Sequence, residues 1–343
     1  MTLPTSLRAG IIGLGIGARH IAGYQAHARC SLVALCDIDT QRLQALGAQY
    51  PGLRVTTEAA DILSDPQINV VSIASYDNYH SEQVVAAVNA GKHVFVEKPL
   101  CLTDEEFGQI DAALCAHPEV QLSSNLVLRS SPQFQQLRKQ IQSGALGCLY
   151  HLEGDYNYGR VEKLTGGWRG QLPFYSVSHG GAIHLIDLLM WLSSGRVSAV
   201  VAVGNQIATK DTQFKHPDMI TALLKFTDGM TAKVTANFGC AMPHHHGLAV
   251  HGTDGSFKHD FLGGVFYHSR DPAIAVEMVN LKFEASQKCD VQHAFVARIL
   301  DGVQSATSVS AADAMNAMAV SLAVERSLNS NAWEPVHYAR SHT

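Results

Sequence analysis

The stretch GIIGLGIGARH, residues 10–20, joins an apolar strand to a helix through a glycine-rich turn. Gly13, Gly15 and Ala18 have the spacing G-x-G-x-x-A. In such a turn the first glycine permits a tight bend, the second lets a pyrophosphate approach the backbone, and the small third residue lets the helix pack on the strand. The helix N-terminus adds N–H groups and the positive end of a dipole. The stretch predicts a dinucleotide site, although a plain turn is the alternative. The expected binding residues are Gly13, Gly15, Ile16 and Gly17.

An acidic residue ends the next apolar run, SLVALCD at residues 31–37. A carboxylate at the position of Asp37 accepts hydrogen bonds from ribose hydroxyls and repels a 2′-phosphate, so it favours NAD over NADP. Arg42 is close enough in sequence to bind a 2′-phosphate, which leaves NADP possible.

The first third of the chain alternates apolar strands with helical segments. Near-continuous apolar strands of this kind predict a parallel sheet covered on both faces. We therefore expect a doubly wound α/β domain, the Rossmann arrangement, over residues 1–125. Its strands are expected at residues 9–15, 31–37, 68–75, 93–98 and 120–125.

The pattern changes after Asn125. Strand-like segments joined by turns predominate, including the Asp-Gly hairpin signal of TDGM at residues 227–230. A strong helical pattern covers residues 180–192. The chain has 343 residues, which suits two domains at roughly 150 residues each. We expect the second domain, residues 126–343, to be α+β with a large, mostly antiparallel open sheet.

Composition excludes several classes of partner. The formal charge of -5 and the lack of a Lys/Arg run argue against nucleic-acid binding. The N-terminal stretch lacks the features of a signal peptide, and no apolar run approaches the roughly 20 residues of a membrane span. The seven cysteines include no C-x-x-C pair. We therefore expect a cytoplasmic protein with reduced thiols and no membrane partner.

The strand HVFVEKPL at residues 93–100 ends in a Glu-Lys-Pro corner. Ligands of open α/β sheets lie beyond the carboxyl ends of the strands. Pro99 biases Lys98 toward an extended backbone, so its ammonium can point from the strand end toward a substrate oxygen. A solvated turn is the alternative for a lysine before a proline.

The ordered motifs GLGIGARH, VVSIASYDNYH, AGKHVFVEKPL and NLVLRSSPQF resemble the Gfo/Idh/MocA family, named for glucose-fructose oxidoreductase, inositol dehydrogenase and a rhizopine-catabolism protein. The resemblance continues through GGWRG and GGAIHLIDLLMWL. It implies that Lys98 lies beside the nicotinamide and the reacting hydroxyl, as a catalytic residue. It also implies cofactor contacts from Ser75, Tyr76, Asn78, His80, Glu97, Lys98 and Asn125. The family commonly has Thr-Pro or similar where this chain has Ser75-Tyr76, and Glu97 could instead be a solvent-facing charge.

The same resemblance indicates the substrate side. It implies that His184, of the motif H-x-x-D, exchanges a proton with the reacting hydroxyl, for which an imidazole is suited. A buried core histidine is the alternative, and Asp187 either orients the imidazole or packs structurally. Many members carry an aspartate four residues before this histidine, whereas this chain has Gly180. Further substrate contacts are expected from Trp168, Arg169, Lys163, Tyr156 and Tyr158.

Three consecutive histidines in PHHHG, residues 243–247, suggest a metal site at first sight. Consecutive strand residues face alternate sides, so the three cannot all bind one ion. We expect no metal, although His244 or His246 could still reach the substrate.

Together these features predict an NAD(P)-dependent dehydrogenase or reductase acting on CH–OH groups of a sugar, cyclitol or sugar nucleotide. Two alternatives remain: an NAD-dependent glycoside hydrolase acting through a transient keto-sugar, and a non-catalytic NAD-binding regulatory protein. Members of the resembling family often pack the open faces of their second-domain sheets together, so a homodimer or homotetramer is expected.

Overall fold

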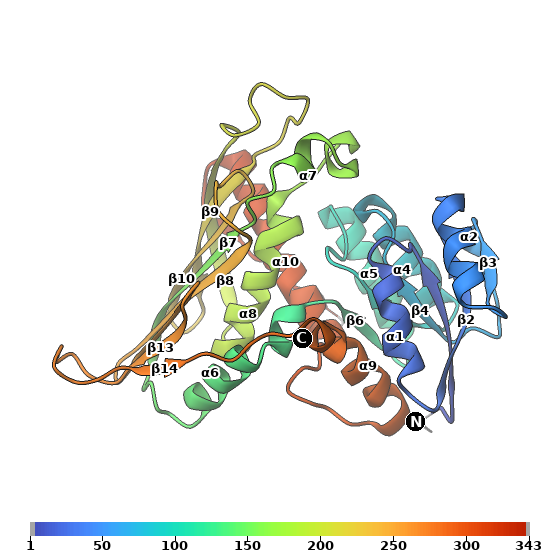
Figure 1. Cartoon of the computed structure of the whole chain (residues 1–343). Coiled ribbons are helices and arrows are strands. Elements are labelled where there is room, and N and C mark those ends of the chain that lie inside the picture. Colours follow the sequence, from blue (N-terminus) through green and yellow to red (C-terminus); the bar gives the residue numbers. More distant parts are fainter. Residues whose placement is uncertain (1–3, 341–343) are drawn as a thin grey trace. The chain divides into compact units, whose positions relative to one another are not determined.

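The computed structural model describes residues 4–340, and the chain divides into two compact units. The first unit contains the residues up to Ser130, Glu284–Asn316 and the residues from Tyr338 on. The second unit contains Ser131–Phe283 and Ala317–His337. Each unit is built around a sheet of its own (Figure 1).

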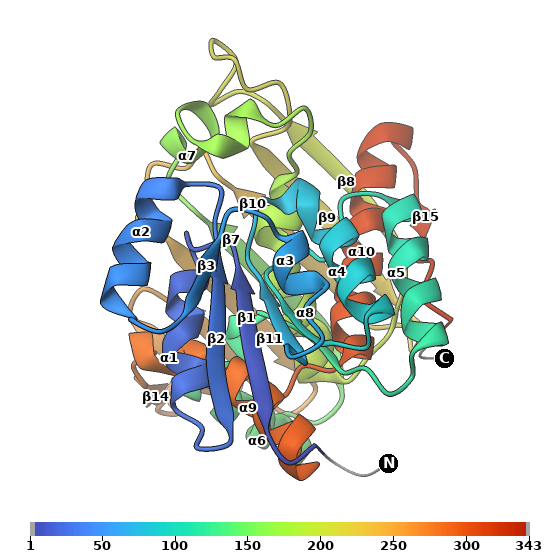
Figure 2. The same ribbon diagram turned by 90° about the vertical axis from the view of Figure 1, so that its right-hand side faces the viewer.

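The sheet of the first unit has six parallel strands in the order β3-β2-β1-β4-β5-β6. They are β1 (Leu7–Ile12), β2 (Cys30–Cys36), β3 (Arg54–Thr56), β4 (Val70–Ile73), β5 (His93–Val96) and β6 (Leu122–Ser124). The strand order reverses between β1 and β4, and ligands of doubly wound sheets bind at this point, beyond the carboxyl ends of the strands. The predicted parallel Rossmann sheet is confirmed; β3, β2 and β1 lie side by side in Figure 2.

Helices alternate with these strands and cover the sheet. They are α1 (His20–Gln25), α2 (Thr40–Gln49), α3 (Ala60–Leu63), α4 (His80–Asn89), α5 (Asp104–Ala116) and, from much later in the chain, α9 (Asp290–Asp301). Helix α9 packs against α1. Phe295 of α9 contacts Phe95 of β5 with ring centroids 5.7 Å apart, and Gln292 donates a hydrogen bond to the carbonyl of His20 (3.1 Å).

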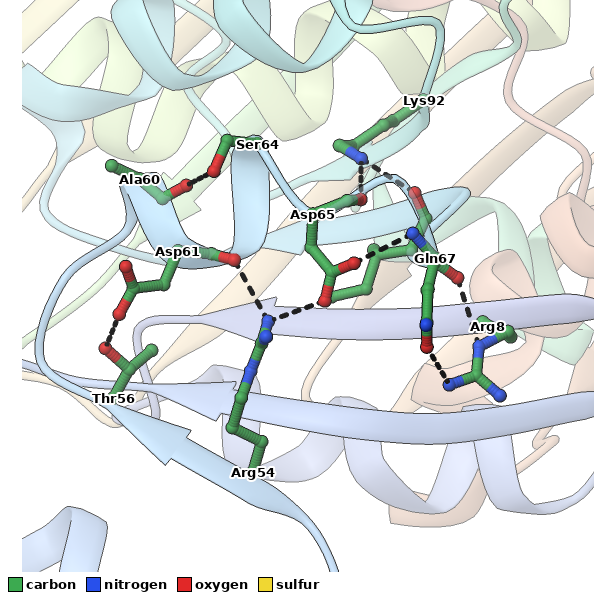
Figure 3. A network of polar contacts seen from close by, with 10 residues as sticks. Arg8, Arg54, Thr56, Ala60, Asp61, Ser64, Asp65, Gln67 and Lys92 are labelled. Atoms are coloured by element: carbon green, nitrogen blue, oxygen red, sulfur yellow. Dashed lines mark hydrogen bonds and ion pairs between the residues drawn. The ribbon is translucent and has the colours of Figure 1, made fainter.

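A polar network fixes the loop that leads into β4 (Figure 3). The buried Lys92, just before β5, donates its ammonium hydrogens to the carbonyls of Asp65 (2.6 Å) and Ile68 (2.7 Å). Arg54 forms an ion pair with the Asp65 carboxylate at 2.9 Å, and Arg8 donates to the carbonyl of Gln67 at 3.1 Å. Burial lowers the pKa of Lys92, and the charge of Asp65 opposes this in part. The network lies at the amino end of β5, away from the carboxyl edge.

The second unit holds a nine-stranded sheet in the order β14-β13-β12-β11-β7-β10-β9-β8-β15. The strands are β7 (Leu149–Asn157), β8 (Val197–Asn205), β9 (Met219–Phe226), β10 (Thr231–Asn237), β11 (His245–Gly252), β12 (Ser256–Asp260), β13 (Gly263–Tyr267), β14 (Glu277–Val279) and β15 (Glu334–Pro335). Strands β7 and β10 pair in parallel, and the other pairs are antiparallel. The predicted large, mostly antiparallel sheet is therefore confirmed.

Helices lie on one face of this sheet. They are α6 (Pro132–Gln142), α7 (Glu162–Thr165), α8 (Ile183–Ser193) and the part of α10 (Ala311–Ser330) from Ala317 on. Helix α8 approaches β7 closely, because a Cβ atom added to Gly154 would lie 3.1 Å from that of Leu185. In the described part of the chain no helix covers the opposite face of the sheet (Figure 1).

None of the helices between residues 4 and 340 is both long enough and apolar enough to cross a bilayer.

Candidate functional site

The glycine loop follows β1 with the backbone geometry that its sequence requires. Gly13 has φ +84°, and a Cβ there would overlap the carbonyl oxygen of Ala74. At Gly15 an added Cβ would meet no protein atom within 4 Å, so open space borders the loop there. At Gly17 it would lie 3.0 Å from Ile11 Cγ2, so Gly17 lies in tight contact with the strand. Ile16 between them is 47% exposed.

Asp37 closes the loop from the end of β2. Its buried carboxylate accepts hydrogen bonds from the amide of Leu14 (2.6 Å) and the amide of Asp39 (2.8 Å). The guanidinium of Arg42 donates to the same carboxylate at 3.0 Å and pairs with Asp39 at 3.1 Å. The hydrogen bond to Asp37, which exceeds the opposing effect of burial, raises the pKa of Arg42. The acid and the arginine, which sequence reasoning treated as competing selectors of the cofactor, are therefore bonded to each other.

Glu97, after β5, belongs to a chain of polar contacts along the carboxyl edge. Asn125, after β6, donates to its carboxylate at 2.6 Å. His20 lies with Nε2 3.3 Å from the same oxygen and Nδ1 2.8 Å from the hydroxyl of Ser72. Burial alone would raise the pKa of Glu97, but the hydrogen bonds of His20 and Asn125 and the charge of Lys98 hold it below its ordinary value. Glu97 is thus an anion held by neighbours rather than a solvent-facing charge.

The Lys98–Pro99 corner is tied to the segment after β4. The peptide bond between these residues is cis, and Lys98 is half-buried. His80 is fully buried, with Nδ1 2.6 Å from the carbonyl oxygen of Pro99 and Nε2 3.1 Å from that of Ser75. The hydroxyl of Ser75 donates to Gln83 at 2.7 Å. His80 therefore connects two backbone segments of the predicted cofactor site.

Two further residues predicted to contact the cofactor, Tyr76 and Asn78, are exposed at the end of β4. With the residues above, they extend along the carboxyl ends of five strands of the sheet, β1, β2, β4, β5 and β6. The open space at Gly15 and the carboxylate of Asp37 fit a dinucleotide, because a pyrophosphate needs close approach to the loop and a ribose needs an acceptor.

In the second unit a π-helical turn, Ser178–Ala182, leads into α8 and its histidine. His184 is 8% exposed and stacks on Tyr156 of β7, with centroids 6.2 Å apart and planes at 17°. Asp187, one turn further on, is buried. A Cβ on Gly181 would lie 2.7 Å from the ring of Tyr156, so this glycine lets the tyrosine approach the helix.

Gly180 also lies against a tyrosine, Tyr175. A Cβ at this position would overlap the hydroxyl of the buried Tyr175. That hydroxyl accepts a hydrogen bond from Nε of Arg169 at 3.0 Å. The guanidinium of Arg169 also lies 4.6 Å from the ring centroid of Trp168. The structure thus joins Trp168 and Arg169, both predicted on the substrate side, to a tyrosine that was not predicted.

Of the remaining predicted substrate contacts, Lys163 on α7 is exposed, and Tyr158 is half-buried with its ring 5.7 Å from that of Tyr156. Sequence reasoning missed His20, Ser72 and Tyr175. His20 is the last residue of the glycine-rich motif GIIGLGIGARH. Its place in this motif is the sequence feature that could have indicated a role in the site.

Among residues 4–340 no group of three or more His, Cys, Asp or Glu side chains could hold a metal ion.

Comparison with known families matches both parts of the chain. Residues 7–125 match the model described as oxidoreductase family, NAD-binding Rossmann fold. Residues 134–258 match the GFO/IDH/MocA C-terminal domain. The resemblance inferred from the motifs, with its NAD-binding fold, is confirmed.

Similar proteins include a 1-carboxy-3-chloro-3,4-dihydroxycyclohexa-1,5-diene dehydrogenase of Comamonas testosteroni, 28% identical over 67% of this chain and 57% of its own length. An inositol 2-dehydrogenase of Acidothermus cellulolyticus is 26% identical over 75% of this chain and 73% of its own length. The match thus spans little more than half of the first relative.

Solved structures share the fold. A levoglucosan dehydrogenase in complex with NADH and L-sorbose superposes with a TM-score of 0.86 at 22% identity, covering 97% of this chain and 100% of the other. A scyllo-inositol dehydrogenase of Lactobacillus casei, with bound NAD(H) and scyllo-inositol, gives 0.80 at 20% identity, covering 96% and 99%.

Proposed function

Because the chain belongs to the Gfo/Idh/MocA oxidoreductase family with its NAD-binding Rossmann fold, we propose that it is an NAD-dependent dehydrogenase of a sugar-like substrate. The reaction moves a hydride between a CH–OH carbon and the nicotinamide. The observation that carries the proposal is the carboxyl edge of the first sheet, where the open glycine loop, the Asp37 carboxylate and the Lys98 corner occur together.

The proposed roles follow from the chemistry of each side chain. NAD, when bound, supplies the hydride acceptor. The ammonium of Lys98 donates a hydrogen bond to the substrate oxygen, which gains negative charge as its proton leaves during oxidation and as hydride reaches the carbonyl carbon during reduction. The imidazole of His184 takes the hydroxyl proton, and returns it when a ketone is reduced. The charge of Lys98 in turn favours the anionic form of Glu97.

Preference for NAD over NADP is proposed from Asp37. Its carboxylate already accepts hydrogen bonds from Leu14, Asp39 and Arg42, which leaves about one lone-pair position, on Oδ1, for a ribose hydroxyl. Arg42 is held by Asp37 and Asp39, and binding a 2′-phosphate would require it to leave both carboxylates.

A sugar, cyclitol or sugar nucleotide is the proposed substrate class. Two relatives are named as dehydrogenases of an inositol and of a dihydroxylated cyclohexadiene. Tyr158 is half-buried and stacks on the buried Tyr156, which is next to His184, so its ring provides a flat apolar surface that suits a ring. We assign Trp168, Arg169, Lys163 and Asp187 to the substrate side on the same basis.

We further propose that residues 1–125 bind the cofactor, that residues 126–343 bind the substrate and form the contacts between subunits, and that the protein is cytoplasmic.

The uncovered face of the second sheet supports a homodimer or homotetramer. Val203 of β8 and Leu223 of β9 are 68% and 47% exposed there. The double variant Val203→Lys/Leu223→Lys should reduce the mass measured by light scattering, and an unchanged mass would contradict this interface.

The function is tested by following nicotinamide absorbance with NAD or NADP and a panel of sugars, inositols and sugar nucleotides. Steady NADH formation is expected with at least one compound. Lys98→Met and His184→Asn should each lower kcat about a thousandfold, while NAD binding, followed by protein fluorescence, is kept. Glycoside cleavage without net NADH formation would indicate a hydrolase, and unchanged kcat in both variants would exclude the proposed roles.

A further inference from the structure

Three histidines gather around the ring of Tyr156 within the second unit. His184 of α8 stacks on this ring at 6.2 Å between centroids. His244 and His246, at the start of β11, approach it edge-on, each with its centroid 5.2 Å away. The rings of His244 and His246 are 4.8 Å apart. One tyrosine is therefore a common neighbour of the proposed proton acceptor and of two histidines without an assigned role.

The register of the sheet explains this arrangement. His246 pairs with Tyr156 across β11 and β7, and side chains of paired residues lie on the same face. His244 lies just before β11, and its ring is beside those of Tyr156 (5.2 Å) and His246 (4.8 Å). His245, between them, stacks instead on Phe261 with centroids 4.1 Å apart. The three consecutive histidines thus separate into a pair beside Tyr156 and one residue directed elsewhere.

The exposure of the three imidazoles around Tyr156 is graded. His184 is buried, His246 is half-buried and His244 is exposed. Tyr158 continues the cluster outward, because its ring lies 5.2 Å from that of His244 and 5.2 Å from the guanidinium of Arg160. The side-chain nitrogen groups of the histidines and Arg160 therefore form a series from the buried His184 to the solvent, beside the rings of Tyr156 and Tyr158.

This pattern has the chemistry of a polyol site. A neutral imidazole offers one N–H donor and one acceptor, which matches a hydroxyl group that both donates and accepts. Aromatic faces cover the apolar C–H faces of a ring. His184 and the pair His244/His246 all have their rings within 6.2 Å of the same tyrosine ring, so a substrate ring with one hydroxyl at His184 can place other hydroxyls near the pair.

We propose that His244 and His246 bind the hydroxyls of the substrate that are remote from the reacting carbon, and so determine which ring polyols are accepted. The proposal deepens the function proposed above and rests on it. It assigns His244 and His246 to substrate binding rather than to proton transfer, because His184 is the residue proposed to transfer the proton.

The test uses the compound of the screen with the highest kcat/KM, together with its monodeoxy derivatives. His244→Ala and His246→Ala should each raise KM about tenfold with kcat changed little, as expected for the loss of ground-state binding. His246→Asn, which keeps a donor and an acceptor, should recover part of the affinity. For the derivative that lacks the remote hydroxyl, wild type and variants should have similar KM values.

The matched control is His245→Ala, which removes an imidazole from the same strand without touching Tyr156. Its KM should equal that of the wild type, and circular dichroism should show all variants folded. KM values for His244→Ala and His246→Ala equal to that of His245→Ala would overturn the assignment. If the wild type oxidises no compound of the screen, the proposed function fails and this inference falls with it.

Discussion

The carboxylate of Asp37, at the end of β2, accepts a hydrogen bond of 2.6 Å from the amide of Leu14 in the glycine loop. The side chain that is proposed to select the cofactor therefore also fixes the loop that would receive its phosphates. A second bond, from Arg42 at 3.0 Å, holds the nearest cation to the same carboxylate. Cofactor choice and loop geometry thus depend on one group.

Asp37→Asn removes the negative charge and keeps the shape of the side chain. Arg42 then loses its main partner and becomes available to a 2′-phosphate, so the ratio of kcat/KM for NAD to that for NADP should fall at least tenfold, about 1.4 kcal/mol. Asp39→Asn is the control, because it removes the other partner of Arg42 and keeps a residue suited to the helix N-cap. An unchanged ratio in Asp37→Asn would show that this carboxylate does not select the cofactor.

His80→Ala should destabilise the first unit and slow turnover. The substitution leaves the carbonyls of Ser75 and Pro99 without their imidazole partner and opens a cavity, at a cost of roughly 2–4 kcal/mol in the free energy of unfolding. Because Pro99 follows Lys98, kcat should fall by a larger factor than the affinity for NAD. Urea unfolding and steady-state kinetics check both parts. His117→Ala, at a less buried histidine of the same unit, should change neither.

Lys92→Met should reduce stability without altering catalysis. The methionine fills a similar volume but leaves the carbonyls of Asp65 and Ile68 without a charged donor, at a cost of about 2 kcal/mol or more. The network lies at the amino end of the strands, so kcat/KM of the folded protein should equal that of the wild type. Lys210→Met, at an exposed lysine, controls for the change of charge. A loss of kcat/KM with full stability would contradict a purely structural role.

Glu325 of α10 makes the stability of the second unit depend on pH. Burial raises the pKa of this carboxyl to about 6, against the opposing effect of a hydrogen bond from Ser176. An unfolded glutamate ionises near pH 4.5, so the folded state holds its proton more tightly, and its stability falls as pH rises from about 4.5 to 6. Above pH 6 the loss of folding stability is constant, on the order of 1–2 kcal/mol.

Glu325→Gln removes this titration and keeps a partner for Ser176. The variant should be more stable than the wild type at pH 8, by on the order of 1–2 kcal/mol, and the difference should vanish near pH 4.5. Urea unfolding at the two pH values measures it. If the free energies of unfolding of the variant and the wild type differ by the same amount at both pH values, Glu325 is not the source of the difference.

Local patterns predicted five of the six strands of the first sheet, all but the short β3, because apolar runs and glycine turns act over a few residues. The loop Gly13–Gly17 and the corner at Lys98 follow from neighbouring residues and were found at the ends of the strands expected. The parallel pairing of β7 with β10 was not predictable, because it joins segments separated by two other strands and two α-helices. The packing of α9 on α1 depends on contacts between opposite ends of the chain and carries no local signal.

The site was predicted as a set of residues but not as a set of contacts. Glu97 was considered as a possible solvent-facing charge, and only the structure shows His20 and Asn125 around it. Likewise, strand alternation predicted that the three consecutive histidines do not share one face, but only the structure shows His244 and His246 beside Tyr156. Which side chains meet across a sheet is set by register, and register is determined by the whole fold.

The contact between Gly180 and Tyr175 limits how this sequence can change. The hydroxyl of Tyr175, held by Arg169, occupies the space that any side chain at position 180 would need. An aspartate, the residue that the family resemblance led us to expect there, cannot enter by one substitution while the tyrosine keeps its place. A side chain at position 180 therefore requires Tyr175 to move or to be replaced as well, and either change would take from Arg169 the hydroxyl to which it donates.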